Sequence, residues 1–222
     1  MNPILTPDAI KFIDLVSPDH PEVLIEMEHL AQERKFPTVG LQAGRALEVI
    51  TTLSGATTAF EFGSGFGYSA YWIARGLPSG GSIVLTDRDQ TELDVAQNFF
   101  NQAGLSHKAI FEVGEAREIF DNRSEQFDLI LFDHHNSNYL PDFNSVKNKL
   151  LPGGVIIADN AMSGLTVDFE GLISFFDSNH SDIDLNDNTL GTANYLLELK
   201  KDPVFKTFIV PLGDGLIVSV LT

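Results

Sequence analysis

The chain has 222 residues, of which 43% are hydrophobic and none is cysteine. This length and composition suit one globular domain with a sizeable core. The lack of thiols excludes disulfides and thiolate metal sites, so any metal must be held by oxygen or imidazole. The net charge of −17, from 31 acidic and 14 basic side chains, would repel a phosphate backbone and argues against nucleic acid as a partner.

The sequence also bears on location. No window approaches eighteen continuous apolar residues, and the first residues, Met-Asn-Pro-Ile-Leu-Thr-Pro, contain neither a basic leader nor an apolar signal core. We therefore expect a soluble, cytoplasmic protein with no membrane partner.

The N-terminal part is predicted to be helical. Thr6-Pro7 and Asp19-His20-Pro21 are helix-start signals, and each is followed by apolar residues at three-to-four spacing. A third helix is expected over residues 41–53. We expect residues 1–55 to form these helices and residues 56–222 to form an α/β core within the same single domain.

Strands and helices alternate along the rest of the chain. Strands are expected at 58–62, 83–86, 109–113, 127–132 and 154–158, and helices at 68–77, 90–103, 115–120, 139–150, 167–177 and 190–201. Apolar runs such as residues 129–132 indicate a parallel sheet covered on both faces. Ligands of such sheets bind at the carboxyl ends of the strands.

The C-terminal part is predicted to be a hairpin. Strands at about 204–210 and 215–221 are joined by the turn sequence Pro-Leu-Gly-Asp-Gly at 211–215. An antiparallel final strand beside a parallel sheet is typical of methyltransferases, whereas dinucleotide dehydrogenases end with a parallel strand.

A glycine-rich turn in residues 58–70 is the strongest local signal. A short strand runs into the turn and then into a helix, an arrangement that aims backbone N–H groups at a ligand. Gly63, Gly65 and Gly67 alternate, and Tyr68 stands where a dinucleotide fold needs its third glycine. This spacing disfavours NAD. A turn that uses glycine only for backbone freedom is the alternative.

Two acidic residues extend this pattern. Glu61 precedes the turn, and Asp87 ends the next predicted strand. With them the stretch resembles the E/D-x-G-x-G-x-G pattern of S-adenosylmethionine-dependent methyltransferases.

Oxygen-bearing side chains follow two further strands. Asp133 comes after strand 127–132, and Asp159 and Asn160 come after strand 154–158. Carboxylate and amide oxygens suit an octahedral Mg²⁺ that keeps positions open for a substrate. Taken singly, each residue could instead cap a helix or turn.

Over nearly its whole length the chain resembles the cation-dependent small-molecule O-methyltransferases, which include catechol and caffeoyl-coenzyme A O-methyltransferases. The matching positions are Val39-Gly40, 61–69, Asp87, 114–116, 133–139, Asp159-Asn160 and 211–215. The resemblance implies a Rossmann-like fold with a mostly parallel seven-stranded sheet, an antiparallel last strand, helices on both faces and extra N-terminal helices. It also implies a homodimer.

The same resemblance implies the site. The donor-binding residues would be Val39, Glu61, Gly63, Ser64, Gly65, Tyr68, Ser69, Asp87, Ala116, Asp133 and His135. Within this set, Asp87 would accept hydrogen bonds from the ribose hydroxyls and Ala116 would present a backbone group to the adenine. Asp133, Asp159 and Asn160 would hold the divalent cation.

One position departs from the family pattern. Asn136 stands where the D-x-x-K-x-x-Y stretch usually has the lysine that takes the proton from the attacking hydroxyl, and an amide cannot accept that proton. Three explanations follow: the cation alone acidifies the hydroxyl, His134 or His135 acts as the base, or the protein binds the donor without this reaction. The candidate catalytic residues are therefore His134, His135 and Asn136.

Four functions follow, in order of preference. The first is cation-dependent methyl transfer from S-adenosylmethionine to a hydroxyl of a small, catechol-like acceptor. The others are a metal-independent methyltransferase, an inactive donor-binding protein and a nicotinamide-dependent reductase. The segment from Met162 to Thr189, where such enzymes usually bind the acceptor, matches no substrate pattern.

Overall fold

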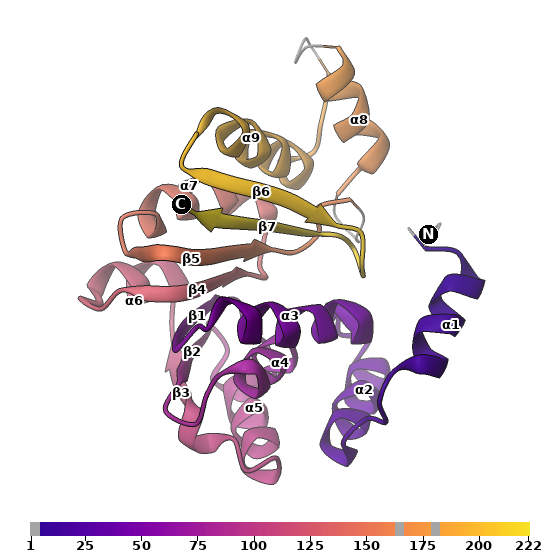
Figure 1. The fold of residues 1–222 in the computed structure, drawn as a ribbon, viewed down its shortest axis with the longest axis vertical. Helices are drawn as coiled ribbons and strands as arrows, with labels where there is room; N and C mark the ends of the chain where they lie inside the picture. The colour runs from indigo at the N-terminus through magenta and orange to yellow at the C-terminus, as the bar shows by residue number, and fades with distance from the viewer. Residues whose placement is uncertain (1–4, 163–166, 179–182) are drawn as a thin grey trace.

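The computed structural model describes residues 5–162, 167–178 and 183–222. It shows one seven-stranded sheet with helices on both faces and further helices at the N-terminus (Figure 1). The helices are α1 Pro7–Val16, α2 Glu22–Arg34, α3 Gly40–Ser54, α4 Tyr68–Gly76, α5 Gln90–Gln102, α6 Ala116–Asn122, α7 Tyr139–Val146, α8 Phe169–Asp177 and α9 Asp187–Lys201, with 3₁₀ turns η1 Ser106–Lys108 and η2 Asn136–Asn138. The strands are β1 Thr58–Phe62, β2 Ser82–Asp87, β3 Ala109–Val113, β4 Phe127–Phe132, β5 Leu150–Ala158, β6 Phe205–Val210 and β7 Leu216–Leu221.

The strand order is β3-β2-β1-β4-β5-β7-β6. Strands β1 to β5 pair in parallel, and β7 runs antiparallel to both of its neighbours, β5 and β6. The expected α/β methyltransferase fold with an antiparallel last strand is therefore confirmed.

The register of the sheet explains how the site is assembled. Phe62 of β1 pairs with Thr86 and Phe132, and Phe132 pairs with Ala158. The residues that follow this row are Gly63, Asp87, Asp133 and Asp159. Four predicted site residues thus lie at the strand ends along one edge of the sheet, because parallel strands place their carboxyl ends together.

Each face of the sheet has its own apolar core, because side chains alternate between the two faces of a strand. On one face, residues such as Leu85 and Leu131 pack against α2 to α5. On the other face, Phe60 and Phe132 pack against α6, α7 and α9. Phe60 is fully buried, and burial of such a side chain contributes roughly 1.5–3 kcal/mol.

The N-terminal helices differ in how they pack. Leu24 of α2 and Leu47 of α3 are fully buried in the core. Helix α1 begins with Thr6 as its cap and has no buried residue, and it projects away from the sheet (Figure 1). Three of its apolar side chains, Phe12, Leu15 and Val16, are exposed.

The expected end of one helix was wrong. The sequence predicted a helix over 139–150 and a strand from 154, whereas α7 ends at Val146 and β5 already begins at Leu150. The backbone N–H of Phe127 donates to Lys149 O at 2.8 Å. Pairing between β4 and β5 therefore begins before the two glycines of β5. A register shift between Phe127 and Leu129 accommodates the extra residues.

The segment expected to bind the acceptor is described in part. Residues 163–166 and 179–182 of it lie outside the described residues. Helix α9 starts at Asp187, earlier than expected, because the Asn186 side chain accepts a hydrogen bond from Thr189 N and caps it. In the described parts of the chain, no helix has both the length and the apolar character needed to cross a membrane.

Candidate functional site

A cleft of about 440 Å³ lies at the carboxyl ends of β1, β2, β4 and β5, a size in the usual range for small-molecule sites. The predicted site residues that line it are Val39, Gly63, Ser64, Gly65, Tyr68, Ser69, Asp87, Ala116, Asp133, His134, His135, Asn136, Asp159 and Asn160. Glu61 is the exception: it is fully buried beneath the cleft and its Oε1 accepts a hydrogen bond from Ser69 Oγ. The fold therefore gathers the predicted residues in one place.

The glycine turn is held by the end of β2. Gly63 adopts a φ of +84°, and a Cβ there would lie 2.7 Å from the Cβ of His134. The N–H groups of Ser64, Gly65 and Gly67 donate to Thr86 O, Asp87 Oδ2 and Ser64 O. These three donors therefore do not point at a ligand as the sequence suggested, because neighbouring acceptors satisfy them.

Asp87 is well placed to receive a ligand. Its Oδ2 accepts from Gly65 N at 2.9 Å and its Oδ1 accepts from Asp89 N at 2.8 Å. These bonds fix the carboxylate at the cleft, and each oxygen keeps a further lone pair for a hydroxyl donor.

Two carboxylates meet at the other end of the cleft. Asp159 is 4% exposed, and its Oδ1 is buried with no hydrogen-bond partner among the described residues. Burial, reinforced by the charge of Asp133, raises the pKa of Asp159 well above its usual value. Burial also raises the pKa of Asp133 to about 6, although Ser69 and His134 oppose the shift. A cation between the two would relieve both effects.

Asn160 completes the set. It has a positive φ of 56°, which is uncommon outside glycine but tolerated by asparagine. The next residues, Ala161 and Met162, donate their N–H groups to Gly215 O and Asp214 O, so the β6–β7 hairpin fixes this segment. In the described part of the chain no three His, Cys, Asp or Glu side chains form a metal-binding group. The candidate set is thus two carboxylates and an amide.

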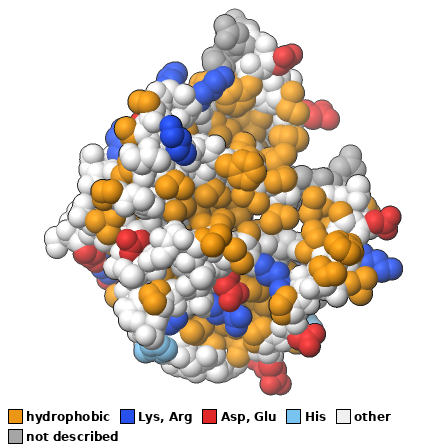
Figure 2. All heavy atoms as spheres, in the orientation of Figure 1, with side chains coloured by type: hydrophobic (Ala, Val, Ile, Leu, Met, Phe, Trp, Pro, Cys, Tyr) orange, Lys and Arg blue, Asp and Glu red, His pale blue; other side chains and the backbone are white. Residues whose placement is uncertain are grey.

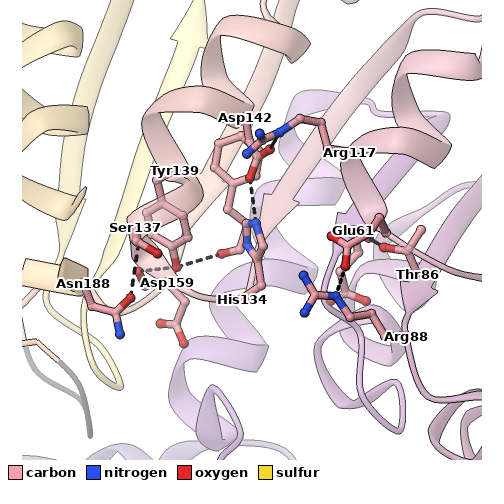
Figure 3. Close-up of polar contacts among 12 residues, drawn as sticks. Glu61, Thr86, Arg88, Arg117, His134, Ser137, Tyr139, Asp142, Asp159 and Asn188 are labelled. Carbon is pink, nitrogen blue, oxygen red and sulfur yellow. Dashed lines mark hydrogen bonds and ion pairs between the residues drawn. The ribbon is translucent and has the colours of Figure 1, made fainter.

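Tyr139 joins the ends of the two strands that carry these residues. Its hydroxyl lies 3.3 Å from Phe132 O and 3.2 Å from Asp159 O, and it donates to this pair of carbonyls (Figure 3). The tyrosine thereby sets the spacing of the loops that begin with Asp133 and Asp159.

The two histidines have different surroundings. His134 Nε2 donates to Asp142 Oδ2 at 2.7 Å, and Asp142, which is 1% exposed, also pairs with Arg117 (Figure 3). Nδ1 of His134 is buried and has no partner among the described residues. His135 is exposed at the cleft.

Asn136 faces helix α9. It is 1% exposed, and its Nδ2 donates to Thr192 Oγ1 at 3.0 Å and to Asn160 O at 3.4 Å. The N–H of the next residue, Ser137, donates to Asn188 Oδ1 at 3.2 Å (Figure 3). At the position where the resemblance implies a lysine, this chain therefore has a buried contact to α9.

Sequence reasoning missed several residues of the site. Phe36 lines the cleft and packs so closely on the glycine turn that a Cβ at Gly65 would lie 2.5 Å from its ring. Asp142 and Arg117 fix His134, and Asp214 lines the cleft from the hairpin. No local motif marks Phe36, whereas Asp214 sits in the Pro-Leu-Gly-Asp-Gly turn, which indicates a hairpin and matches the family but was not predicted to line the cleft.

Comparison with known proteins agrees with this geometry. A family model described as O-methyltransferase matches residues 15–221. A catechol O-methyltransferase of Niastella koreensis is 29% identical over 155 residues, covering 67% of this chain and 70% of that protein. Caffeoyl-CoA O-methyltransferase 2 of Petunia hybrida is 26% identical over 213 residues, covering 90% of this chain and 84% of that protein.

Solved structures share the fold. An O-methyltransferase from Bacillus cereus in complex with SAH superposes with a TM-score of 0.80 at 22% identity, covering 97% of each chain. The O-methyltransferase TomG from Streptomyces achromogenes in complex with SAM gives a TM-score of 0.79 at 22% identity, covering 96% of this chain and 95% of that one. Since the family model spans almost all of the sequence, this chain belongs to the O-methyltransferase family and is an S-adenosylmethionine-dependent O-methyltransferase of small molecules.

Proposed function

We propose that this enzyme methylates a hydroxyl of a small, catechol-like acceptor that is held by a divalent cation, Mg²⁺, at Asp133, Asp159 and Asn160. The observation that carries the proposal is the unpartnered, buried Oδ1 of Asp159 beside a second carboxylate. Buried carboxylates without partners are strongly destabilising unless a counter-charge is present. The three oxygen donors fit a hard cation with open positions for the acceptor.

The donor would occupy the cleft between the glycine turn and Ala116. Asp87 would receive the ribose hydroxyls with the two lone pairs described above, and the methionine part would lie near Ser69 and Val39. Gly63 and Gly65 both line the cleft, so the donor would lie against this turn.

Glu61 would support the methionine end from below. Burial raises its pKa to about 8, with the charge of Asp133 adding to the shift and hydrogen bonds from Ser64 and Ser69 opposing it. Its Oε2 has no partner among the described residues. A positively charged donor in the cleft would favour the ionised form of this carboxyl group.

The reaction needs the acceptor oxygen aligned with the sulfonium methyl group and stripped of its proton. A bound divalent cation would supply orientation of the hydroxyl and a lower pKa for it. Phe36, which lines the cleft, would help the protein to exclude water. We propose that His135, which is exposed at the cleft, accepts the proton, because Nδ1 of His134 is buried, its Nε2 bonds to Asp142, and Asn136 cannot act as a base.

The N-terminal helices support a homodimer as a further part of this proposal. They expose apolar side chains on surfaces that cover nothing in the single chain: Phe12, Leu15 and Val16 on α1, Ile25 on α2, and Val49 and Leu53 on α3. A light-scattering mass near twice the 24.4 kDa of one chain would agree, and a mass of one chain at micromolar concentration would contradict it.

The cation proposal is tested by calorimetry and turnover. S-adenosylhomocysteine should bind with and without Mg²⁺, catechol should bind only when Mg²⁺ is present, and EDTA should abolish methylation of catechol. Equal rates in Mg²⁺ and in excess EDTA would contradict the cation site and favour a metal-independent methyltransferase. Tight binding of S-adenosylhomocysteine without methylation of any catechol would contradict the acceptor class.

A further inference from the structure

A second hollow lies beside the site, on the face of the molecule shown in Figure 2. It is an open groove of about 980 Å³ between α8, α9, the end of β6 and the residues that follow β5. Its lining is almost entirely apolar, and Ile173 of α8 and Ile209 of β6 contribute exposed side chains to it. Figure 2 shows hydrophobic side chains gathered over this region.

The groove adjoins the proposed cation site. Asn160 lines the donor cleft, and the next two residues, Ala161 and Met162, line the groove. Met162 is tied to the cleft from the other side, because its N–H donates to the carbonyl of Asp214, which also lines the cleft. The cleft and the groove therefore lie on either side of residues 160–162, and a molecule whose hydroxyl is held at Asp159 and Asn160 would reach the groove by crossing this segment.

The charges of the groove restrict what it accepts. Among its lining residues in the described part of the chain, Lys200 is the single cation, and Asp177 also lines the groove. The whole chain carries a net charge of −17. A polyanionic acceptor such as a coenzyme A thioester would need several cationic partners for its phosphates, and this groove does not provide them.

We propose that the groove binds an apolar extension of the acceptor, so that the substrate is an uncharged hydroxylated molecule with a long alkyl or polycyclic tail. The inference rests on the proposed function, because it assumes that the acceptor hydroxyl is held at Asp159 and Asn160. Helix α8 thereby determines specificity, since it forms one wall of the groove and lies in the segment without a substrate pattern.

The experiment compares catechol with 4-hexylcatechol. Each is titrated into the protein with S-adenosylhomocysteine and Mg²⁺, and kcat/KM is measured with S-adenosylmethionine. Burial of one side of the hexyl chain should lower the Kd roughly twofold per methylene. We therefore expect 4-hexylcatechol to bind roughly 10- to 100-fold tighter than catechol and to show a similar gain in kcat/KM. Caffeoyl-coenzyme A should gain nothing over catechol.

Three variants test whether the gain from the hexyl chain comes from contacts in the groove. Ile173→Ser and Ile209→Ser lie on opposite walls and should each reduce the ratio between the two ligands at least threefold. Ile110→Ser, on β3 and also exposed, is the matched control and should keep the ratio. Both groove residues are exposed, so the substitutions should leave the fold intact, which circular dichroism checks.

The outcomes separate this inference from the proposed function. Methylation of catechol with no gain from the hexyl chain overturns the groove and leaves the proposed function standing. A chain-length gain in calorimetry without turnover supports the groove and contradicts the proposed function. If the groove variants keep the ligand ratio but lower the mass in light scattering, the groove is an interface between copies and the inference is wrong.

Discussion

At the scale of single residues, the two aspartates at the ends of β4 and β5 are the most consequential. Their loops start from paired positions of adjacent strands, and the Tyr139 hydroxyl fixes the carbonyls beside them. Asp159 is buried and Asp133 is partly buried, and the charge of each carboxylate raises the free energy of the other when no counter-charge is present. The proposed divalent cation would relieve this repulsion.

Asp159→Ala tests this interpretation. We expect methyl transfer in Mg²⁺ to fall at least about 100-fold, because the cation loses a charged ligand, while the Kd of S-adenosylhomocysteine changes less than about threefold. The free energy of unfolding without metal should stay the same or rise, since a buried charge is removed. Asp94→Ala on the exposed side of α5 is the control. Full Mg²⁺-dependent turnover in Asp159→Ala would exclude the site.

His135→Ala tests the proton acceptor. Loss of a general base typically lowers the rate by about 100- to 10,000-fold, so kcat should fall while the affinity for S-adenosylhomocysteine changes little. Measurement of kcat from pH 6 to 10 should show the variant recovering at high pH, where hydroxide replaces the base. An unchanged kcat at neutral pH would mean that acidification by the cation is sufficient.

Asn136→Lys tests whether the family's lysine can simply be restored. The buried Asn136 amide donates to Thr192 Oγ1, so a lysine there would lose that bond and place an ammonium against α9. We expect a loss of about 2–4 kcal/mol in the free energy of unfolding, measured in urea, and no increase in kcat. A faster enzyme of unchanged stability would show that the lysine can reach the cleft.

At the scale of elements, α9 positions the loop after β4. Gly191 lets the helix approach so closely that a Cβ there would lie 2.3 Å from Asn136 O and 2.6 Å from Ser137 Cα. Thr192 and Asn188 on the same helix bond to this loop. The helix therefore supports the segment that carries Asp133, His134 and His135, although it contributes no residue to the lining of the donor cleft.

Gly191→Ala should separate the helix from the loop. Overpacking of this kind typically costs about 1–3 kcal/mol, and we expect kcat to fall as well, because the loop would shift at the cleft. Gly80→Ala is the matched control, since a Cβ at Gly80 meets nothing within 4 Å. Equal stability of the two variants, measured by thermal unfolding, would contradict the close packing.

At the scale of the whole molecule, charge and topology set different properties. The seven-stranded sheet places the donor cleft and the apolar groove side by side, because β5 ends between them and the antiparallel hairpin closes that edge. The net charge of −17 has no part in this arrangement. It opposes compaction through repulsion between surface carboxylates.

Salt should therefore stabilise the protein. Added ions screen repulsion over about 10 Å at 0.1 M ionic strength, so we expect Tm to rise by a few degrees between 0.02 and 0.5 M NaCl. Differential scanning calorimetry with NaCl and with KCl checks this, and similar shifts in both salts are the control for specific binding. A falling Tm would show that the favourable ion pairs, such as Arg75 with Glu48, outweigh the repulsion.

The amino-acid sequence by itself determined the order of elements, the C-terminal hairpin and the glycines and acidic residues at the strand ends that line the cleft. These follow from local signals: apolar runs, glycines at a strand end and acidic residues at the points where parallel strands must stop together. The end of α7 could not be predicted from the sequence, because the hydrogen bond between Phe127 and Lys149 across the sheet overrides the helical pattern.

Only the tertiary structure decided what each of those residues can do. It turned Asn136 toward α9, bound His134 to Asp142, left His135 at the cleft and covered the glycine turn with Phe36. It also formed the apolar groove from α8, α9 and β6. The physical reason is that orientation and burial depend on contacts between segments far apart in the chain, which no local pattern of residues specifies.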